Sequence, residues 1–226
     1  MFNVLWGAAF AAVNFGLFLS CYKLFGRTGL YAWVALATVV ANIQVVKTIE
    51  LAGLVMTLGN TIYASIFLAT DLLNEKFGEK AARRAVYIGF FSLISTTIIM
   101  QMVLRFEPQA GDFAQSSLET IFGLMPQLAA GSLIAYFVSQ LLDVRIFSLL
   151  RKVFPKPGQL WIRNNGSTLI SQMVDTVIFC SIAFLTEYPF DVWLQIVLTT
   201  YLIKAVVSIV STPFIYWARS LRAPEN

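Results

Sequence analysis

The chain of 226 residues contains no histidine. This absence excludes histidine-based acid or base catalysis, histidine-ligated metal sites and histidine proton relays. The sequence also lacks a glycine-rich phosphate loop, a paired-cysteine motif and a serine in a nucleophile elbow. A carboxylate or Ser/Lys mechanism remains chemically open, but no set of residues fills the roles of an active site. We therefore expect no enzyme, no cofactor and no metal.

Charged residues and cysteines are also scarce. Only 12% of the residues are charged and 58% are hydrophobic, and the mean hydropathy is +0.74. The two cysteines, Cys21 and Cys180, fall within or at the edge of apolar stretches, so no disulfide framework is expected. This composition indicates an integral membrane protein.

Long apolar runs fill most of the chain. About 20 apolar residues are needed for one helical crossing of a bilayer. Helices are the expected spanning form, because lipid offers no partner to an unpaired backbone group. The sequence therefore predicts an all-α, polytopic membrane bundle in a single transmembrane domain, residues 1–226. The predicted spans are Phe2–Tyr22, Leu30–Val46, Leu51–Leu73, Ala85–Leu104, Ile121–Leu142, Ser167–Thr186 and Val192–Ala218.

The lysines and arginines test this division, because they accumulate in short cytoplasmic loops. Lys47 and Arg105 lie on one predicted side, and Lys204 lies inside the last span. The amino terminus is therefore expected outside and the carboxyl terminus in the cytoplasm, which accounts for the net charge of +4 without a nucleic acid partner. The other predicted side holds Lys23, Arg27, Lys76, Lys80, Arg83, Arg84, Arg145, Arg151, Lys152, Lys156, Arg163, Arg219 and Arg222.

Two charges lie near the middle of predicted spans. They are Asp175 and Lys204. A charge at the centre of a spanning helix costs roughly 2.5 to 3.5 kcal/mol, so something must compensate for it. A structural ion pair that only fixes helix packing is one explanation. A binding site is the other, because buried pairs are poor stabilisers.

Other polar and aromatic side chains recur at helical spacing. Such faces are expected to turn toward the bundle interior or a water-filled cavity. Interhelical hydrogen bonding is an alternative role for the neutral groups. The acids also have an alternative role, which is ion pairing at the cytoplasmic boundary. It would join Asp71, Glu75 and Asp143 to Lys76, Arg83, Arg84 or Arg145. The predicted substrate-binding residues are Asn42, Tyr63, Phe67, Asp71, Gln140, Thr168, Gln172, Asp175, Phe179 and Lys204.

Two short segments resemble each other. Residues 139–147 read SQLLDVRIF and residues 171–179 read SQMVDTVIF. The residue alphabet of membrane spans is narrow and the two copies are predicted at different depths, so no repeat architecture is inferred. In the loop before the sixth span, Asn165 or Ser167 is expected to cap the following helix.

Several separate motifs occur in order between about Ala41 and Tyr216. They are YASIFLATDLLNEKFG (63–78), Ala-Arg-Arg (82–84), the 139–147 segment, RNNGSTLISQMVDTVIF (163–179) and YLIKAVVSIVSTPFIY (201–216). Together they resemble the queuosine precursor transporter family of vitamin uptake transporters, and residues 1–29 look like an added amino-terminal helix and loop. Many members carry Asp before Thr-Pro-Phe where this chain has Ser211, so a carboxylate role there is absent or moved.

The resemblance implies uptake of a 7-deazaguanine, such as 7-cyano-7-deazaguanine, its aminomethyl derivative or queuine, for tRNA modification. The implied location is the cytoplasmic (inner) membrane, which the chain would cross several times in contact with lipid. Asp175 would accept two ring N–H donors, and Lys204 would balance that carboxylate or bind the ring. The ring carbonyl would be read by Gln172 or Asn42, and an aromatic residue would stack on the base.

Two other classes of protein remain open. One is a substrate-binding membrane subunit that works with a separate ATPase module, and the other is a structural membrane protein. The chain is small for a carrier with two inverted repeats, which leaves room for a homodimer.

Overall fold

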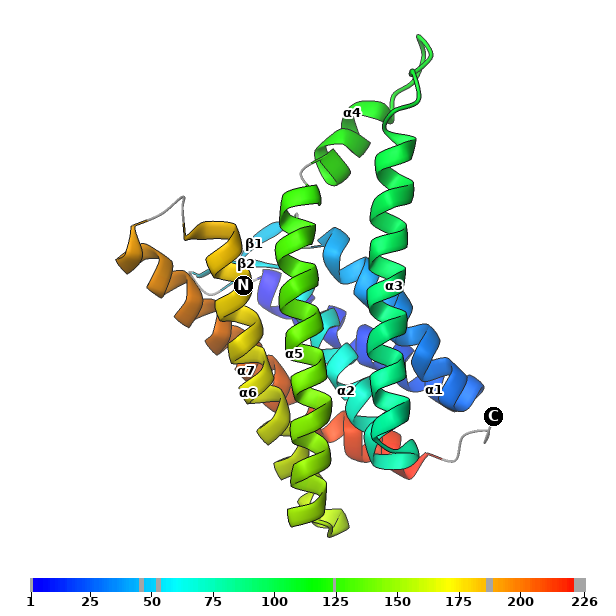
Figure 1. Cartoon of the computed structure of the whole chain (residues 1–226), viewed down its shortest axis with the longest axis vertical. Coiled ribbons are helices and arrows are strands. Elements are labelled where there is room, and N and C mark those ends of the chain that lie inside the picture. Colours follow the sequence, from blue (N-terminus) through cyan, green and yellow to red (C-terminus); the bar gives the residue numbers. More distant parts are fainter. Residues whose placement is uncertain (1, 45–46, 52–53, 124, 186–188, 222–226) are drawn as a thin grey trace.

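The computed structural model describes residues 2–44, 47–51, 54–123, 125–185 and 189–221 (Figure 1). Helices dominate the chain, with one short β-hairpin. The long helices are α1 (Phe2–Gln44), α2 (Gly59–Phe77), α3 (Glu79–Val103), α5 (Met125–Val153), α6 (Leu160–Phe184) and α7 (Phe190–Ser220). The short elements are β1 (Thr48–Leu51), β2 (Leu54–Thr57), α4 (Gln115–Leu118), a π turn at Glu119–Gly123 and a 3-10 turn at Pro157–Gln159.

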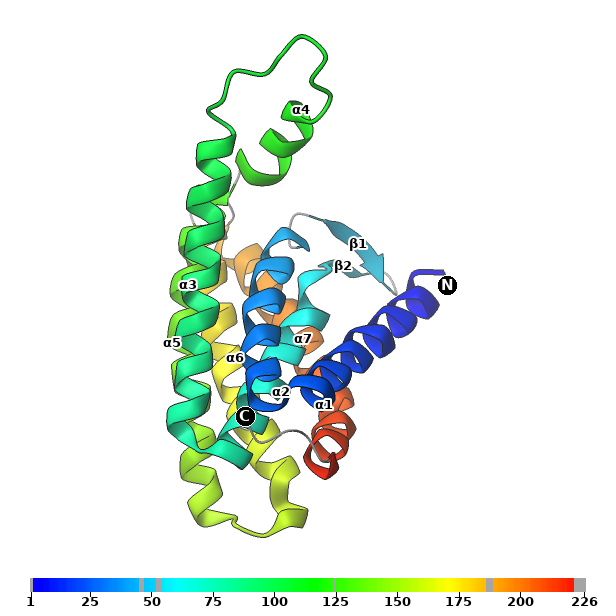
Figure 2. The same ribbon diagram turned by 90° about the vertical axis from the view of Figure 1, so that its right-hand side faces the viewer.

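Helix α1 is bent into two arms at Gly26. The backbone there has φ 58° and ψ −136°, a conformation that glycine adopts without the steric penalty of a side chain. The predicted spans Phe2–Tyr22 and Leu30–Val46 fall on the two arms, although residues 45 and 46 lie outside the described part. Figure 2 shows the arms diverging from the bend. Helix α1 therefore contains the first two predicted spans, one in each arm.

The third predicted span, Leu51–Leu73, is wrong at its start. Strands β1 and β2 form an antiparallel hairpin that pairs Thr48 with Thr57, and α2 begins only at Gly59. A short apolar run rich in β-branched residues is compatible with strand as well as helix, and hydropathy alone does not separate them. The hairpin is a small addition to a bundle that is helical, as expected. Helix α2 then continues to Phe77, and Gly78 turns the chain into α3 with φ 84°.

The fifth and sixth spans also begin elsewhere than predicted. Helix α5 starts at Met125 and continues to Val153. Helix α6 starts at Leu160, so Asn165 and Ser167 lie inside it and cap nothing. The run Arg-Asn-Asn-Gly looks like a loop in the sequence, but burial of Arg163 with an acidic partner keeps it helical.

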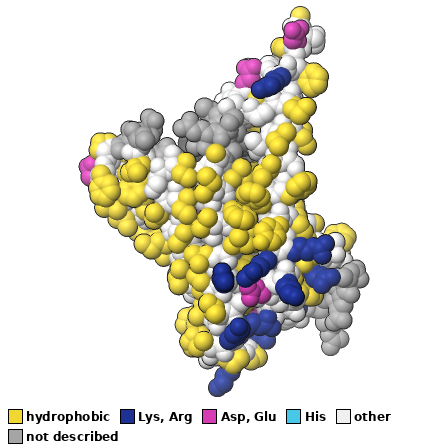
Figure 3. Space-filling view, in the orientation of Figure 1, with side chains coloured by type: hydrophobic (Ala, Val, Ile, Leu, Met, Phe, Trp, Pro, Cys, Tyr) yellow, Lys and Arg dark blue, Asp and Glu magenta, His cyan; other side chains and the backbone are white. Residues whose placement is uncertain are grey.

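The molecule exposes apolar side chains and buries polar ones. Large hydrophobic residues such as Phe91, Ile170 and Leu202 are exposed, while many Ser, Thr, Asn, Gln and Asp side chains are buried between helices. Figure 3 shows hydrophobic side chains over most of one face. A soluble protein does not expose so much apolar surface, whereas a membrane protein faces lipid with it. Four helical stretches are long and apolar enough to cross a membrane: α1, α3, Ala130–Val153 of α5, and α7.

The cationic segments gather at one end of the bundle. In Figures 1 and 2 the turns between α2 and α3 and between α5 and α6 lie at the same end as the close of α7. Figure 3 shows Lys and Arg side chains concentrated there. Lys76 donates to the Tyr22 hydroxyl at 2.6 Å, and the Arg27 guanidinium lies 5.7 Å from the Phe77 ring centre. These contacts hold the bend of α1 against α2 at the cationic end.

Candidate functional site

Asp175 on α6 and Lys204 on α7 form a direct ion pair inside the bundle. Lys204 Nζ lies 2.7 Å from Asp175 Oδ2, and the two side chains are 11% and 7% exposed. Their contact offsets the cost of placing each charge away from water. The two charges singled out in the sequence therefore belong to one centre.

Aromatic rings line this centre on the side of α2 and α5. Lys204 Nζ lies 5.9 Å from the centre of the Tyr63 ring, within the range of a cation–π contact. The Tyr63 ring meets the Tyr136 ring edge to face, with centroids 6.0 Å apart and planes at 90°. Tyr136 was not predicted from the sequence, because a single tyrosine in an apolar run carries no signal of its own. The ion pair is thus bordered by two aromatic faces.

Close helix packing fixes the position of Tyr136. A Cβ atom added to Gly89 on α3 would lie 2.4 Å from the Tyr136 hydroxyl and 2.9 Å from Thr38 Oγ1. Thr38 Oγ1 also contacts the Tyr136 hydroxyl at 3.4 Å, and Asn42 Nδ2 donates to the Thr38 carbonyl at 2.9 Å. Asn42 therefore joins the site through Thr38 and Tyr136, and no contact between Asn42 and Asp175 is seen among the described residues.

Helices α5 and α6 exchange two equivalent hydrogen bonds. Ser139 Oγ donates to Asp175 Oδ1 at 3.1 Å, and Ser171 Oγ donates to Asp143 Oδ1 at 2.9 Å. The two helices run antiparallel, so the first serine of one similar segment meets the aspartate of the other. The similarity between residues 139–147 and 171–179 is therefore a structural correspondence.

Buried amides and hydroxyls between these contacts have unused hydrogen-bonding atoms. Gln140 is fully buried, and neither its Oε1 nor its Nε2 has a partner in the described structure. Gln172 Oε1 and Thr168 Oγ1 are likewise buried without a partner there. Because burial of an unpaired polar group costs free energy, such atoms are candidates to bind a polar ligand or water.

The remaining predicted aromatic residues flank the same helices. Tyr63, Phe67 and Asp71 follow each other at four-residue spacing along one face of α2, and Phe67 is buried. Phe179 is half-buried on α6, one turn beyond Asp175, and its ring lies beside Gly131 of α5. All ten predicted residues thus lie on α1, α2, α5, α6 or α7, and Lys204 contacts both Asp175 and Tyr63.

Two further acids form a separate pair. Asp71 on α2 faces Asp143 on α5, and both are buried. Pairing with Lys76, Arg83, Arg84 or Arg145 was one expectation for them. That alternative is wrong within the described structure, because Lys76 binds Tyr22, Arg83 binds Glu79, and no ion pair reaches either aspartate.

Glu75 forms the centre of an arginine cluster at the cationic end. Arg163 Nη2 donates to Glu75 Oε1 at 2.8 Å, and arginines 219 and 151 approach that carboxylate at 3.6 and 3.8 Å. Arg163 also donates to the Phe154 carbonyl at 2.7 Å. Sequence analysis placed Arg163 just outside the sixth span, whereas it is buried in α6. Hydropathy cannot find such a pair, because the partners are far apart in sequence.

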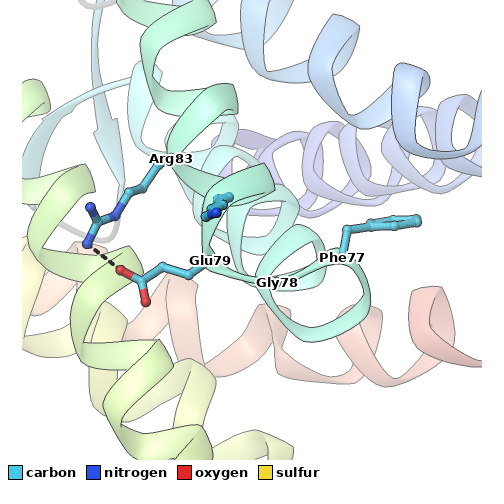
Figure 4. Close-up of a pocket in the computed structure, with 5 residues that line it drawn as sticks. Phe77, Gly78, Glu79 and Arg83 are labelled. Atoms are coloured by element: carbon cyan, nitrogen blue, oxygen red, sulfur yellow. Dashed lines mark hydrogen bonds and ion pairs between the residues drawn. The ribbon is translucent and has the colours of Figure 1, made fainter.

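A surface hollow of about 460 Å³ lies at the turn between α2 and α3. Figure 4 shows Glu79 directed toward Arg83 with Phe77 pointing away from them. None of the predicted site residues lines this hollow. We therefore place the candidate site at the interior centre. Among the described residues, no group of three or more His, Cys, Asp or Glu could hold a metal ion.

Comparison with known proteins agrees with the motifs. The family described as putative vitamin uptake transporter matches residues 57–218. The chain belongs to this family. The vitamin uptake transporter match covers α2 through most of α7, and so every predicted site residue except Asn42. The resemblance found in the sequence is confirmed.

Individual relatives carry more specific names. A probable queuosine precursor transporter of Bacillus subtilis is 52% identical to this vitamin uptake transporter family member, across 98% of the chain and 96% of the relative. The queuosine precursor transporter of Escherichia coli is 29% identical, with 75% of each chain covered. A probable queuosine precursor transporter of Haemophilus influenzae is 32% identical, with 68% of this chain and 64% of the relative covered. No solved structure matches significantly.

Proposed function

We propose that this protein carries a queuosine precursor across the cytoplasmic membrane for tRNA modification. The substrate is a 7-deazaguanine, such as the cyano or aminomethyl derivative or queuine. The names of the relatives support this class. The observation that carries the proposal is the buried Asp175–Lys204 pair beside Tyr63, with unpartnered amides on the adjoining helices.

The chemistry of this centre suits a guanine-like ring. Asp175 accepts adjacent N–H donors of the ring in a forked arrangement, while the Lys204 ammonium balances the carboxylate charge. Gln172 and Gln140 supply free amide atoms for the ring carbonyl and the remaining donors. Tyr63 offers an aromatic face for stacking. A buried site with these groups rejects analogues that leave its polar atoms unpaired.

The proposed topology has seven membrane crossings. They are the two arms of α1, then α2, α3, α5, α6 and α7. Helices α2 and α6 carry buried polar side chains, which lowers their hydropathy. Helix α6 exposes apolar residues such as Ile170 and Met173, whereas the described residues of α2 are mostly buried among the other helices. The gathering of Lys and Arg at one end supports a cytoplasmic carboxyl terminus and an external amino terminus.

The α5–α6 correspondence suggests how the substrate is exposed to each side in turn. Inverted repeats related by a pseudo-twofold axis in the membrane plane are a recurring basis for alternating access, with the substrate near mid-membrane. Here the Ser139–Asp175 and Ser171–Asp143 bonds occupy equivalent positions in antiparallel helices. Exchange between two equivalent packings of α5 and α6 would open the centre to one side and then to the other.

Uptake by the purified chain in liposomes tests this function. We expect accumulation of radiolabelled 7-cyano-7-deazaguanine without any other protein, and its loss in Asp175→Asn. Asp191→Asn, which changes an exposed acid at the start of α7, is the matched control and should transport normally. Binding without transport until an ATPase module is added would instead identify a substrate-binding subunit.

A further inference from the structure

The Asp71–Asp143 pair differs from the Asp175 centre in its charge balance. Asp175 and Asp143 occupy corresponding positions in the two similar segments, and each accepts a serine hydroxyl from the opposite helix. Asp175 faces the Lys204 ammonium, whereas Asp143 faces a second carboxyl group, Asp71. The partner of Asp175 is therefore a cation, whereas the partner of Asp143 is a second acid.

Two buried carboxylates cannot both stay ionised at close range without compensation. Asp71 is 1% exposed and Asp143 is 0% exposed. Burial and a neighbouring like charge both disfavour the second negative charge. Both oxygens of Asp71, and Oδ2 of Asp143, have no hydrogen-bond partner among the described residues. A proton bound by one of the two carboxyl groups removes this second charge.

Within the described parts of the surrounding helices, no free cation faces the pair. On α2 the pair has Glu75 as a titratable neighbour, which is another acid. From α6 the pair meets the hydroxyls of Ser167, Thr168 and Ser171. The buried residues described for α1 and α3 include no charged side chain. The buried cations of α6 and α7 are already bound, Arg163 to Glu75 and Lys204 to Asp175.

A neighbouring side chain points independently to a bound ligand. The Thr168 hydroxyl faces both carboxyl groups, is almost fully buried and has no hydrogen-bond partner in the described structure. The amide of Gln140, one turn before Asp143 on α5, is also buried without a partner there. Buried polar atoms of this kind are expected to be satisfied.

We propose that Asp71 and Asp143 form a proton-binding site that couples substrate movement to a proton gradient. This inference rests on the proposed function. A proton shared between the two carboxyl groups takes the place that the Lys204 ammonium occupies at the other centre. It enters from the outer water as the substrate binds and is released to the cytoplasm with the substrate. No covalent bond other than the carboxyl O–H is made or broken.

The coupling follows from the cost of moving an unprotonated pair. Two extra negative charges inside the bundle oppose the repacking of α2 against α5 and α6, whereas a pair holding a proton is easier to move through the interior. Gln140 and Gln172 each lie one helical turn from an aspartate, so proton and substrate bind to the same two helices. The carrier therefore reorients with both bound.

Infrared spectroscopy of the full chain in lipid nanodiscs tests the protonated pair without any substrate. We expect a carboxylic acid C=O band at neutral pH that shifts in D₂O. It should disappear in the double variant Asp71→Asn/Asp143→Asn and persist in Asp175→Asn, which keeps both acids of the pair. Absence of the band from the wild-type protein, or its persistence in the double variant, would overturn the proposal.

Liposome transport of 7-cyano-7-deazaguanine tests the coupling. When the outside solution is more acidic than the liposome interior, the wild-type protein should accumulate the substrate. A pH-sensitive dye trapped inside should report proton influx at the same time. Asp71→Asn cannot take up or release the shared proton, so it should lose accumulation driven by pH, whereas the control Asp191→Asn should keep it. An unchanged thermal unfolding temperature shows that Asp71→Asn is folded.

The outcomes separate this inference from the proposed function. Accumulation driven by a sodium gradient and indifferent to pH would overturn the proton site, as would pH-driven accumulation in Asp71→Asn. If the wild-type protein binds no 7-deazaguanine but shows the carboxylic acid band, the proposed substrate fails while the proton site is supported.

Discussion

Ser139 on α5 donates a hydrogen bond to Asp175 on α6, and the same bond is returned from Ser171 to Asp143. The two bonds join residues at the same positions of two similar segments. They place one aspartate beside Lys204 and the other beside Asp71. A single local pattern therefore supports two centres with different charge, one suited to a planar polar substrate and the other to a proton.

Replacing either serine by alanine should affect the two centres differently. Ser139→Ala removes a hydrogen bond to the charged Asp175, worth roughly 1.5 to 3 kcal/mol, so substrate binding should weaken about tenfold or more. Ser171→Ala should leave binding nearly unchanged and alter the pH dependence of transport. Binding by titration calorimetry and uptake across a pH series measure these effects.

Ser181→Ala is the control for both variants. This serine lies on α6 and donates only to its own helix, at the Val177 carbonyl. It should behave like the wild-type protein. Equal loss of binding in the variants at 139 and 171 would contradict the division into two centres.

Gly89→Ala should weaken substrate binding by displacing Tyr136. The added Cβ would meet the Tyr136 hydroxyl at 2.4 Å, and the displaced ring would no longer hold Tyr63 edge to face. Tyr136→Phe removes the obstructing oxygen, so the double variant should recover much of the binding. Gly16→Ala is the control, because no atom lies within 4 Å of its added Cβ. If Tyr136→Phe does not restore binding, the Tyr136 hydroxyl is not the cause of the weaker binding in Gly89→Ala.

Arg163→Met should destabilise the protein strongly. It leaves the buried Glu75 carboxylate without its closest partner, and breaking a buried pair costs about 3 to 5 kcal/mol. The approach of two further arginines to Glu75 should keep the loss near the lower figure. Arg83→Met breaks a more exposed pair with Glu79 and should cost about 1 kcal/mol or less. Thermal unfolding in detergent compares the stability of the two variants. Equal losses of stability would contradict the structural role of Arg163.

The sequence predicted the helical membrane character and singled out the two charges of the ion pair for clear physical reasons. Apolar runs of about 20 residues report lipid exposure, and a charge within such a run must be compensated. Asp175 and Lys204 were therefore recognisable, and the structure joins them. Their aromatic neighbour Tyr136 was not, because its role depends on the close approach of Gly89 on another helix.

Boundaries and distant pairings could not be predicted in the same way. Hydropathy treats an apolar strand and an apolar helix alike, so the hairpin before Gly59 was assigned to a span. It also treats Arg163 as a loop residue, because the Glu75 that compensates it lies 88 positions away. The similarity between the two serine–glutamine–aspartate segments was visible, but only antiparallel packing gives it meaning.

Thermal stabilisation of the purified protein by a panel of ligands tests the central claim most directly. A ligand that binds only the folded state stabilises it by about 2.7 kcal/mol at one hundred times its dissociation constant. We predict a selective upward shift of Tm with 7-deazaguanines, little shift with guanine or unrelated vitamins, and loss of the shift in Asp175→Asn but not in Asp191→Asn. No shift with any 7-deazaguanine from the folded wild-type protein, or an undiminished shift in Asp175→Asn, would contradict the account.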